Sequence, residues 1–241
     1  MTINELFRYT LKSLRHEIAP KVKKQVDFAL PSWPMVDACR TATLATFQPW
    51  IAAGRLTVAQ MQRACRRYHL GQTKSGQPIY WMIDDLQRPL DAHIGTDSWL
   101  SQLLKTREPL ISNWCVEHCL FGLHLRTAPD LSPLSSICVV ESESSAVILS
   151  ELFPEVLWMA WVSTAHLSPS LFYPLEGYKV TIYPRTDPCG SSYLFFQNLA
   201  ALVRRQRPSI AITVDSILEK HASEAQKARG IDLLDFLFTP P

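Results

Sequence analysis

The chain has 241 residues, of which 47% are hydrophobic and 19% charged, a composition that excludes a disordered tail and suffices for a sizeable core. Its 24 basic and 22 acidic residues give a formal charge of +2, so any case for nucleic-acid binding depends on local clusters. No stretch approaches the roughly 18 apolar residues of a membrane helix, and the N-terminus lacks the pattern of a secretory signal. We therefore expect a cytoplasmic protein without a membrane partner.

The six cysteines are scattered and form no Cys-x-x-Cys pair, so no zinc ribbon is expected. The tightest group is Cys115, His118 and Cys119, in which the two cysteines lie one helical turn apart. Three ligands at that spacing would still need a fourth from elsewhere, and cysteine is common in protein cores. Reduced core residues are the favoured interpretation, and a metal site is the alternative.

The first part of the chain is predicted to be mainly helical. Apolar residues recur at a spacing near 3.6 between residues 3 and 29, which predicts an amphipathic helix that Pro20 ends or kinks. Another helix, broken by a proline, is expected over residues 35–53. Thr57 is a suitable N-cap for a third helix over residues 57–68.

Further along the chain the pattern changes and predicts a small sheet. Residues 78–84 are rich in strand formers, and turn residues separate them from a second such run at 89–94, so we expect a β-hairpin. A short helix is expected over residues 97–112, whereas the apolar run 120–125 fits either a strand or a helix. The segment 129–136 is rich in Pro and Ser and is the expected domain boundary.

From residue 137 onward, strand-like and helical segments alternate, which predicts a parallel α/β sheet with right-handed crossovers. The expected strands lie at residues 137–140, 156–161, 178–183 and 209–214. The expected helices lie at residues 142–153, 191–205, 216–229 and 233–238. The chain is thus divided into a helical region of unknown role (1–56), a small α+β region (57–134) and an α/β domain (135–241).

Acidic residues follow two of these strands at the point where each ends. Glu141 and Glu143 come directly after the first strand of the α/β domain. Asp187 follows the third strand, with Arg185 two residues before it. Ligands of an open parallel sheet bind outside the carboxyl ends of the strands, so these side chains can meet at one site that suits Mg²⁺. Each also has a local explanation, a helix start for the glutamates and turn chemistry for the aspartate.

The order of these segments resembles the Toprim domain of primase-type proteins, in which one strand ends in Glu-Gly-Glu and a later strand ends in Asp-x-Asp. The corresponding strings here are Val139-Val-Glu-Ser-Glu143 and Val180-Thr-Ile-Tyr-Pro-Arg-Thr-Asp187. Gly230-Ile-Asp-Leu-Leu-Asp235 is similar to the Asp-x-x-Asp segment that closes many primase Toprim domains. Tyr68-His-Leu-Gly71 and the hairpin are similar to the segment before Toprim. Toprim-like proteins of bacterial mobile elements share this order, including a segment like Cys119-Leu-Phe-Gly-Leu-His124.

The resemblance implies a Toprim-like parallel-sheet domain preceded by a small helical region and a β-hairpin, with Mg²⁺ as its cofactor. Glu141 matches the glutamate that acts as a ligand or general acid/base in active members, and Glu143 matches the second glutamate. Asp187 matches the second aspartate of Asp-x-Asp. We therefore take these three residues as candidate metal ligands, with Asp232 and Asp235 as further acidic candidates.

Two departures from the family pattern put this metal site in doubt. Arg185 stands in place of the first aspartate, which removes one ligand and changes the local charge by two units. Ser142 stands where glycine is usual, which narrows the approach of a phosphate. Arg185 has two open interpretations: an ion pair with Glu141 or Glu143 that substitutes for the metal, or a direct contact with a nucleic-acid phosphate.

Two basic clusters are further candidates for contacts with phosphate, and each is also consistent with a solvated helix face. They consist of Arg63, Arg66 and Arg67 with Tyr68 and His69, and of Arg204, Arg205 and Arg207. The favoured hypothesis is a primase-derived, nucleic-acid-associated protein of a mobile genetic element, with DNA as the favoured partner and with reduced or no catalysis. The alternatives are an active Mg²⁺-dependent primase-like nucleotidyltransferase or nuclease, and a protein-interaction module whose N-terminal region supplies the partner surface.

Overall fold

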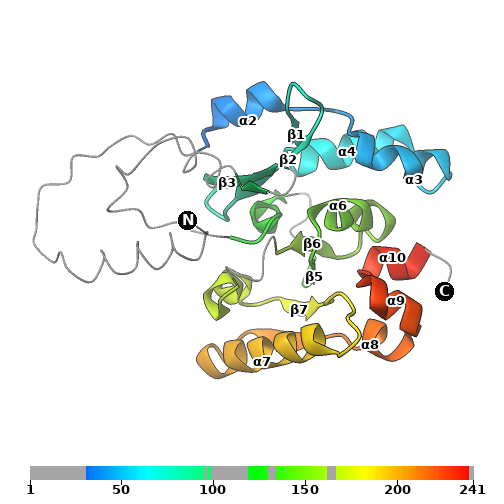
Figure 1. The fold of residues 1–241 in the computed structure, drawn as a ribbon. Coiled ribbons are helices and arrows are strands. Elements are labelled where there is room, and N and C mark those ends of the chain that lie inside the picture. The colour runs from blue at the N-terminus through cyan, green and yellow to red at the C-terminus, as the bar shows by residue number, and fades with distance from the viewer. Residues whose placement is uncertain (1–30, 95–96, 99–118, 130–133, 162–166, 239–241) are drawn as a thin grey trace, which may run out of the picture.

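Two four-stranded sheets organise the chain, one antiparallel and one parallel (Figure 1). The computed structural model describes residues 31–94, 97–98, 119–129, 134–161 and 167–238. The predicted fold class, an α/β protein in which helices and a β-hairpin precede a parallel-sheet domain, is confirmed. The helix expected over residues 3–29 lies outside the described residues.

Short helices precede the first sheet. They are α2 (Trp33–Cys39), the 3-10 helix η1 (Ala45–Phe47), α3 (Gln48–Ala52) and α4 (Val58–Arg67). The break expected at Pro49 within residues 35–53 is misplaced, because the non-helical backbone of Arg40 (φ −51°, ψ 137°) already ends α2. Pro49 lies in the first turn of α3, where its missing N–H breaks no hydrogen bond. Thr57 caps α4 as predicted, and its side chain and that of Gln60 each accept a hydrogen bond from the other's backbone N–H.

The central strand β2 (Pro78–Ile83) of the antiparallel sheet is buried on both faces. The other strands of this sheet are β1 (Gly71–Gln72), β3 (Pro89–Ile94) and β4 (Asp97–Ser98). Successive residues of β2 point to opposite faces: Trp81 packs in a small core with Val36 of α2, whereas Tyr80 joins the main core of the protein. This explains why the strand is apolar almost throughout. The predicted hairpin is confirmed by the pairing of β2 with β3.

The helix expected from residue 97 is wrong at its start, because β4 pairs with the end of β3. That pairing depends on a neighbouring strand, which a local pattern cannot show. The rest of the expected helix lies outside the described residues.

The parallel sheet has the strand order β6-β5-β7-β8. Its strands are β5 (Ser136–Val140), β6 (Leu157–Ala160), β7 (Lys179–Ile182) and β8 (Ala211–Val214). Its helices are α6 (Glu143–Leu152), α7 (Ser191–Gln206), α8 (Ile217–His221), α9 (Glu224–Arg229) and α10 (Leu233–Phe238). The helix expected over residues 216–229 is two helices, because Ser223 starts a new one with its own capping box. A 3-10 helix, η5 (Pro169–Leu175), was not expected.

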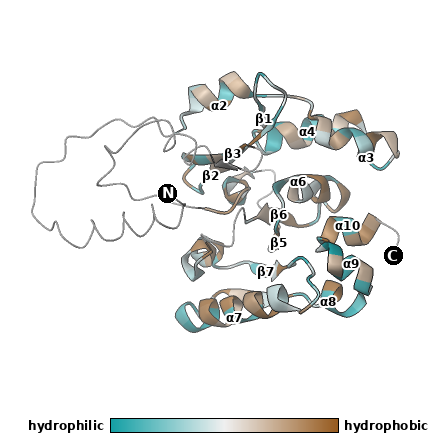
Figure 2. Ribbon diagram, viewed as in Figure 1, coloured by the Kyte–Doolittle hydropathy of each residue, from teal (hydrophilic) through white to brown (hydrophobic). Residues whose placement is uncertain are grey.

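The two crossovers of this sheet run in opposite directions. The chain passes from β5 through α6 to β6 on one side, and from β7 through α7 to β8 on the other. Right-handed crossovers therefore place α6 and α7 on opposite faces of the sheet, as Figure 1 shows. Figure 2 shows hydrophobic and hydrophilic turns alternating along α7, as expected for a helix with one side packed on the sheet. Among the helices that the structure describes, none has the length and apolar character needed to cross a membrane.

The segment around Phe121 joins the two sheets. Phe121 forms an antiparallel bridge with Ala160 and so covers the edge of β6. Tyr68 stacks on Phe121 and donates a hydrogen bond from Oη to the carbonyl oxygen of Trp158 at 2.8 Å. Gly122 has a φ of 84°, and a Cβ there would lie 3.1 Å from both Tyr68 and the Trp158 carbonyl. The Tyr68 and Gly122 motifs of the sequence therefore meet at one buried junction.

We predict that Tyr68→Phe destabilises the protein by about 1 kcal/mol, because it leaves a buried carbonyl without its hydrogen-bond donor. Urea unfolding monitored by circular dichroism measures the change. Tyr193→Phe is the matched control, since the Tyr193 hydroxyl accepts a hydrogen bond from the nearby Gln197 side chain on α7 and not from a distant element among the described residues. Equal stability of the two variants would contradict the role assigned to Tyr68.

Candidate functional site

The point between β5 and β7, where the crossovers diverge, is the place where an open parallel sheet of this kind leaves a crevice. Glu141 follows β5 and Arg185 follows β7, so both side chains belong to this crevice. The Nε of Arg185 lies 2.7 Å from Oε2 of Glu141. The side chains are 48% and 26% exposed respectively, so solvent reaches the pair. Of the two interpretations of Arg185, the structure has the ion pair with Glu141.

Further carboxylates lie near the Arg185–Glu141 ion pair. Burial raises the pKa of Glu141, the Arg185 guanidinium opposes that rise, and the charge of Asp232 adds to it. Burial, followed by the charge of Asp232, raises the pKa of Asp235. Glu141, Asp232 and Asp235 therefore share one electrostatic environment, in which Arg185 supplies a compensating positive charge.

Asp232 and Asp235 also start the last helix. The Asp232 carboxylate accepts a hydrogen bond from the Asp235 backbone N–H at 2.9 Å and another from the Ser145 hydroxyl of α6. The Asp232 backbone carbonyl accepts from Phe236 N. Asp232 is buried, so its carboxylate fastens α10 to α6 beside the crevice.

Glu143 contacts the antiparallel sheet. Its buried carboxylate lies 2.6 Å from Nδ1 of His93, on strand β3 of the antiparallel sheet. Glu143 thus connects the first turn of α6 to the other sheet. The structure does not bring Glu143 together with Asp187.

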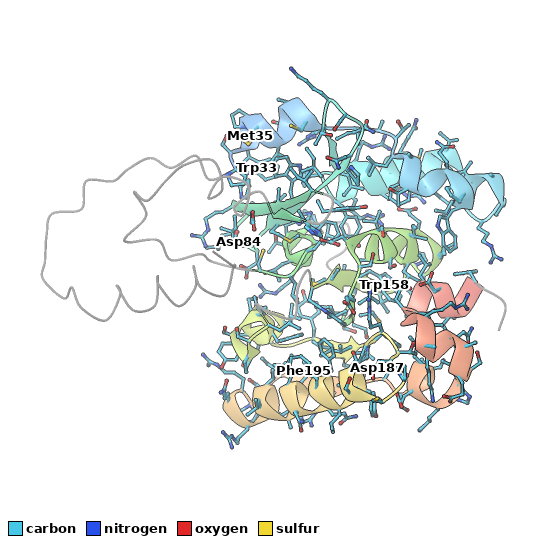
Figure 3. All side chains as sticks on the ribbon, viewed as in Figure 1. Trp33, Met35, Asp84, Trp158, Asp187 and Phe195 are labelled. Carbon is cyan, nitrogen blue, oxygen red and sulfur yellow. The ribbon has the colours of Figure 1, made fainter. Side chains whose placement is uncertain are left out.

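Asp187 caps the start of α7 (Figure 3). Its Oδ1 accepts from the backbone N–H groups of Cys189 and Ser191, both at 3.0 Å, and from the Ser191 hydroxyl. Its Oδ2 accepts from Ser192 N at 2.7 Å. Partial desolvation by itself would raise the pKa of Asp187, but the hydrogen bonds outweigh this effect and lower the pKa. The lone pairs of the carboxylate are therefore used within the protein.

These carboxylates, as arranged, do not fit a shared Mg²⁺, which needs several oxygen ligands around one point. In residues 31–94, 97–98, 119–129, 134–161 and 167–238, no three His, Cys, Asp or Glu side chains are grouped to hold a metal ion. The metal role of Glu141, Glu143 and Asp187 stays a prediction. Cys115 and His118 of the alternative metal site lie outside the described residues, and the described Cys119 is a free thiol.

The first basic cluster lies at the other end of α6. Arg63 and Arg67 of α4 both form ion pairs with the buried carboxylate of Glu151, near the C-terminus of α6. Arg66 is exposed, and no ion pair is found for it within the part of the chain that the structure describes. These three arginines line a groove of about 790 Å³ between α4, the β2–β3 turn and the 3-10 helix η2 (Leu123–Thr127).

The second basic cluster lies on the last turn of α7. Nη1 of Arg204 donates to the carbonyl oxygen of Ile212 at 2.7 Å, which ties the end of α7 to β8. Arg204 and Arg205 are both exposed. Both side chains therefore remain accessible to a phosphate.

Besides His69, which belongs to the predicted basic cluster, the groove contains two residues, Gln87 and His124, that the sequence did not single out as a site. His69, Gln87 and His124 line it together with the arginines. The two histidine rings lie 5.3 Å apart, centroid to centroid, although 55 positions separate them in the sequence. Both lie in segments that resemble primase-type motifs, but no local pattern indicates that these segments meet.

One family model matches the chain, over residues 45–186, and it is described as a domain of unknown function, DUF6371. The match covers more than half of the chain. The chain belongs to this family. The matched range includes the groove, Glu141 and Arg185, and it ends before Asp187, Asp232 and Asp235.

The chain matches none of the curated proteins with which it was compared. It is similar to a solved structure described as the DnaG primase catalytic domain bound to ssDNA, with 13% identity and a TM-score of 0.40. The similarity covers 74% of this chain and 62% of the primase chain, so this chain spans less than two thirds of that protein's length. At this TM-score the similarity assigns no role to any residue.

We predict that Asp187→Ala destabilises the protein by about 1 kcal/mol at pH 7, as expected for the loss of a helix cap. Because folding lowers the pKa of Asp187, its contribution is complete above the pKa of an unfolded aspartate, about 3.9, and is lost as the pH falls through the lower folded value. The difference between Asp187→Ala and the natural protein should therefore shrink in acid. Unfolding followed at several pH values measures it, and a difference that does not depend on pH would contradict the account.

Proposed function

We propose that the protein binds single-stranded or primed nucleic acid, with DNA favoured, through a Toprim-type fold in which an ion pair has replaced the catalytic metal. The order of the Glu141, Arg185 and Asp232 segments, which resembles that of primase-type proteins, supports this proposal. The positions of Glu141 and Arg185, at the ends of neighbouring strands of a parallel sheet, also support the proposal. In this proposal the protein belongs to a mobile genetic element and descends from a primase.

The contact between Arg185 and Glu141 is the main observation that supports the proposed loss of catalysis. A guanidinium 2.7 Å from the carboxylate oxygen places a fixed positive charge where a ligand of Mg²⁺ would have to bind the metal. Glu143 and Asp187 are engaged by His93 and by the amides of α7. A cation would therefore have to displace several internal contacts at once.

Nucleic-acid binding in this proposal depends on side chains away from the crevice. Arg66 and Arg205 are exposed, and Arg63 is half exposed beside its partner Glu151. Arginine donates paired hydrogen bonds to phosphate oxygens and releases counterions from a strand. Binding that depends on few phosphates is weak and salt-dependent, and it is insensitive to base sequence.

One observation favours a second candidate, an active Mg²⁺-dependent nucleotidyltransferase or nuclease. The raised pKa values of Glu141 and Asp235 are the kind of perturbation that clusters at functional sites. In that candidate the crevice rearranges to hold one metal, and Glu141 is the ligand or general acid/base. Arg185 would then leave Glu141 and contact a phosphate.

Fluorescence anisotropy with a labelled single-stranded oligonucleotide tests the proposal. We predict binding at low salt that weakens about tenfold or more between roughly 50 and 200 mM NaCl, as neutralising a few phosphates requires. A chelator should leave the affinity unchanged, and so should Glu141→Gln. Lack of binding to any strand at low salt would contradict nucleic-acid binding. Mg²⁺-dependent synthesis or cleavage that Glu141→Gln abolishes would favour the second candidate.

A further inference from the structure

The groove lined by Arg63, Arg66, Arg67, His69, Gln87 and His124 is separate from the acidic crevice. Glu143, beside the crevice, is the first residue of α6, whereas Glu151, which binds Arg63 and Arg67, is in its last turn. The helix has ten residues, so its two ends are about 15 Å apart. The groove is therefore a second candidate site, distinct from the crevice.

The arginines leave an excess of positive charge in the groove. One carboxylate, that of Glu151, is shared between Arg63 and Arg67. The acidic residue of the groove wall, Asp85, is already paired with Arg126 at 2.7 Å. Arg66 thus adds a charge that no carboxylate in the described residues offsets. An anion is the ligand that this charge distribution favours.

His124 supplies the opposite kind of group, a hydrogen-bond acceptor. Its side chain is buried, and burial lowers its pKa to about 4, so the ring is neutral at pH 7. Nε2 lies 3.1 Å from the carbonyl oxygen of Arg67, which can only accept, so we assign the ring proton to Nε2. Nδ1 is then an acceptor, and it has no hydrogen-bond partner among the described residues. Such an atom calls for an O–H or N–H donor.

The groove wall around His124 is held rigidly. The Gln87 side chain donates to the backbone carbonyl of His124 at 3.1 Å and to the Thr127 hydroxyl at 2.9 Å. Gln87 and His69 both have left-handed backbone conformations, with φ of 61° and 52°. Both conformations have local causes, since His69 closes a Schellman motif at the end of α4 and Gln87 lies in the turn of the β2–β3 hairpin. A preformed wall lowers the ordering cost of binding.

We propose that this groove binds one nucleotide unit, with its phosphate on Arg63, Arg66 and Arg67, and that the His124 ring shifts on binding so that its buried Nδ1 accepts from a sugar hydroxyl or base N–H. The inference rests on the proposed function and assigns a site to it. A phosphate offers only acceptors to the arginines, and a sugar or base offers the donor that His124 lacks. The volume of about 790 Å³ lies within the range of small-molecule sites, roughly 300 to 1,000 Å³.

Equilibrium dialysis of the full chain with adenosine 5′-monophosphate and, separately, with inorganic phosphate tests the proposal at low salt. We expect the nucleotide to bind more tightly than inorganic phosphate. Arg66→Ala should weaken nucleotide binding about tenfold, the usual effect of losing a hydrogen bond to a charged group. Arg66 is exposed, so this variant should fold. Lys220→Ala, at an exposed cation on α8 that does not line the groove, is the matched control and should change the affinity less than twofold.

Nucleotide affinity that is unchanged in Arg66→Ala, or that falls equally in Lys220→Ala, would overturn the proposal. Equal affinity for inorganic phosphate and the nucleotide would overturn the role of His124 and with it the nucleotide site. If an oligonucleotide binds in a salt-dependent way but the mononucleotide does not, this inference fails while the proposed function stands. If the mononucleotide binds through Arg66 but no strand binds, the proposed function fails instead.

Discussion

The divergence of the two crossovers at β5 and β7 is the constraint on which the arrangement of the α/β domain depends. It puts α6 and α7 on opposite faces and leaves the carboxyl ends of the two central strands uncovered between them. The residues that follow those strands, Glu141 and Arg185, must therefore meet there. Because they form an ion pair 2.7 Å long, the position where the topology expects a ligand holds an internal contact.

Helix α6 links that crevice to the second candidate site. Its first turn carries Glu143, bound to His93 of the antiparallel sheet, and Ser145, bound to Asp232. Its last turn carries Glu151, bound to two arginines of α4. Both ends are thus fixed by buried carboxylates. This gives the protein a rigid frame between an acidic crevice and a basic groove, and the match to the DUF6371 family covers both ends of the helix.

The parts of the fold that follow from local chemistry could be predicted from the sequence. Thr57 and Gln60 form a capping box because both partners lie within one turn. Strands β5 and β6 of the parallel sheet were recognisable because burial on both faces gives a continuous apolar run. By contrast, the bridge between Phe121 and Ala160, the short strand β4 and the 5.3 Å approach of His69 to His124 depend on distant segments. For Arg185 the sequence left open an internal ion pair or a contact with a phosphate. The three-dimensional structure was needed to identify the ion pair with Glu141.

We propose that the Arg185 guanidinium, paired with Glu141, takes the place of a metal ion. Calorimetric titration of Mg²⁺ into the natural protein and into Arg185→Asp tests this proposal most directly. We predict no saturable binding to the natural protein. In Arg185→Asp we predict saturable binding that the double variant with Glu141→Gln loses, because the substitution restores a carboxylate beside Glu141. Saturable binding of Mg²⁺ to the natural protein, abolished by Glu141→Gln alone, would contradict the proposal.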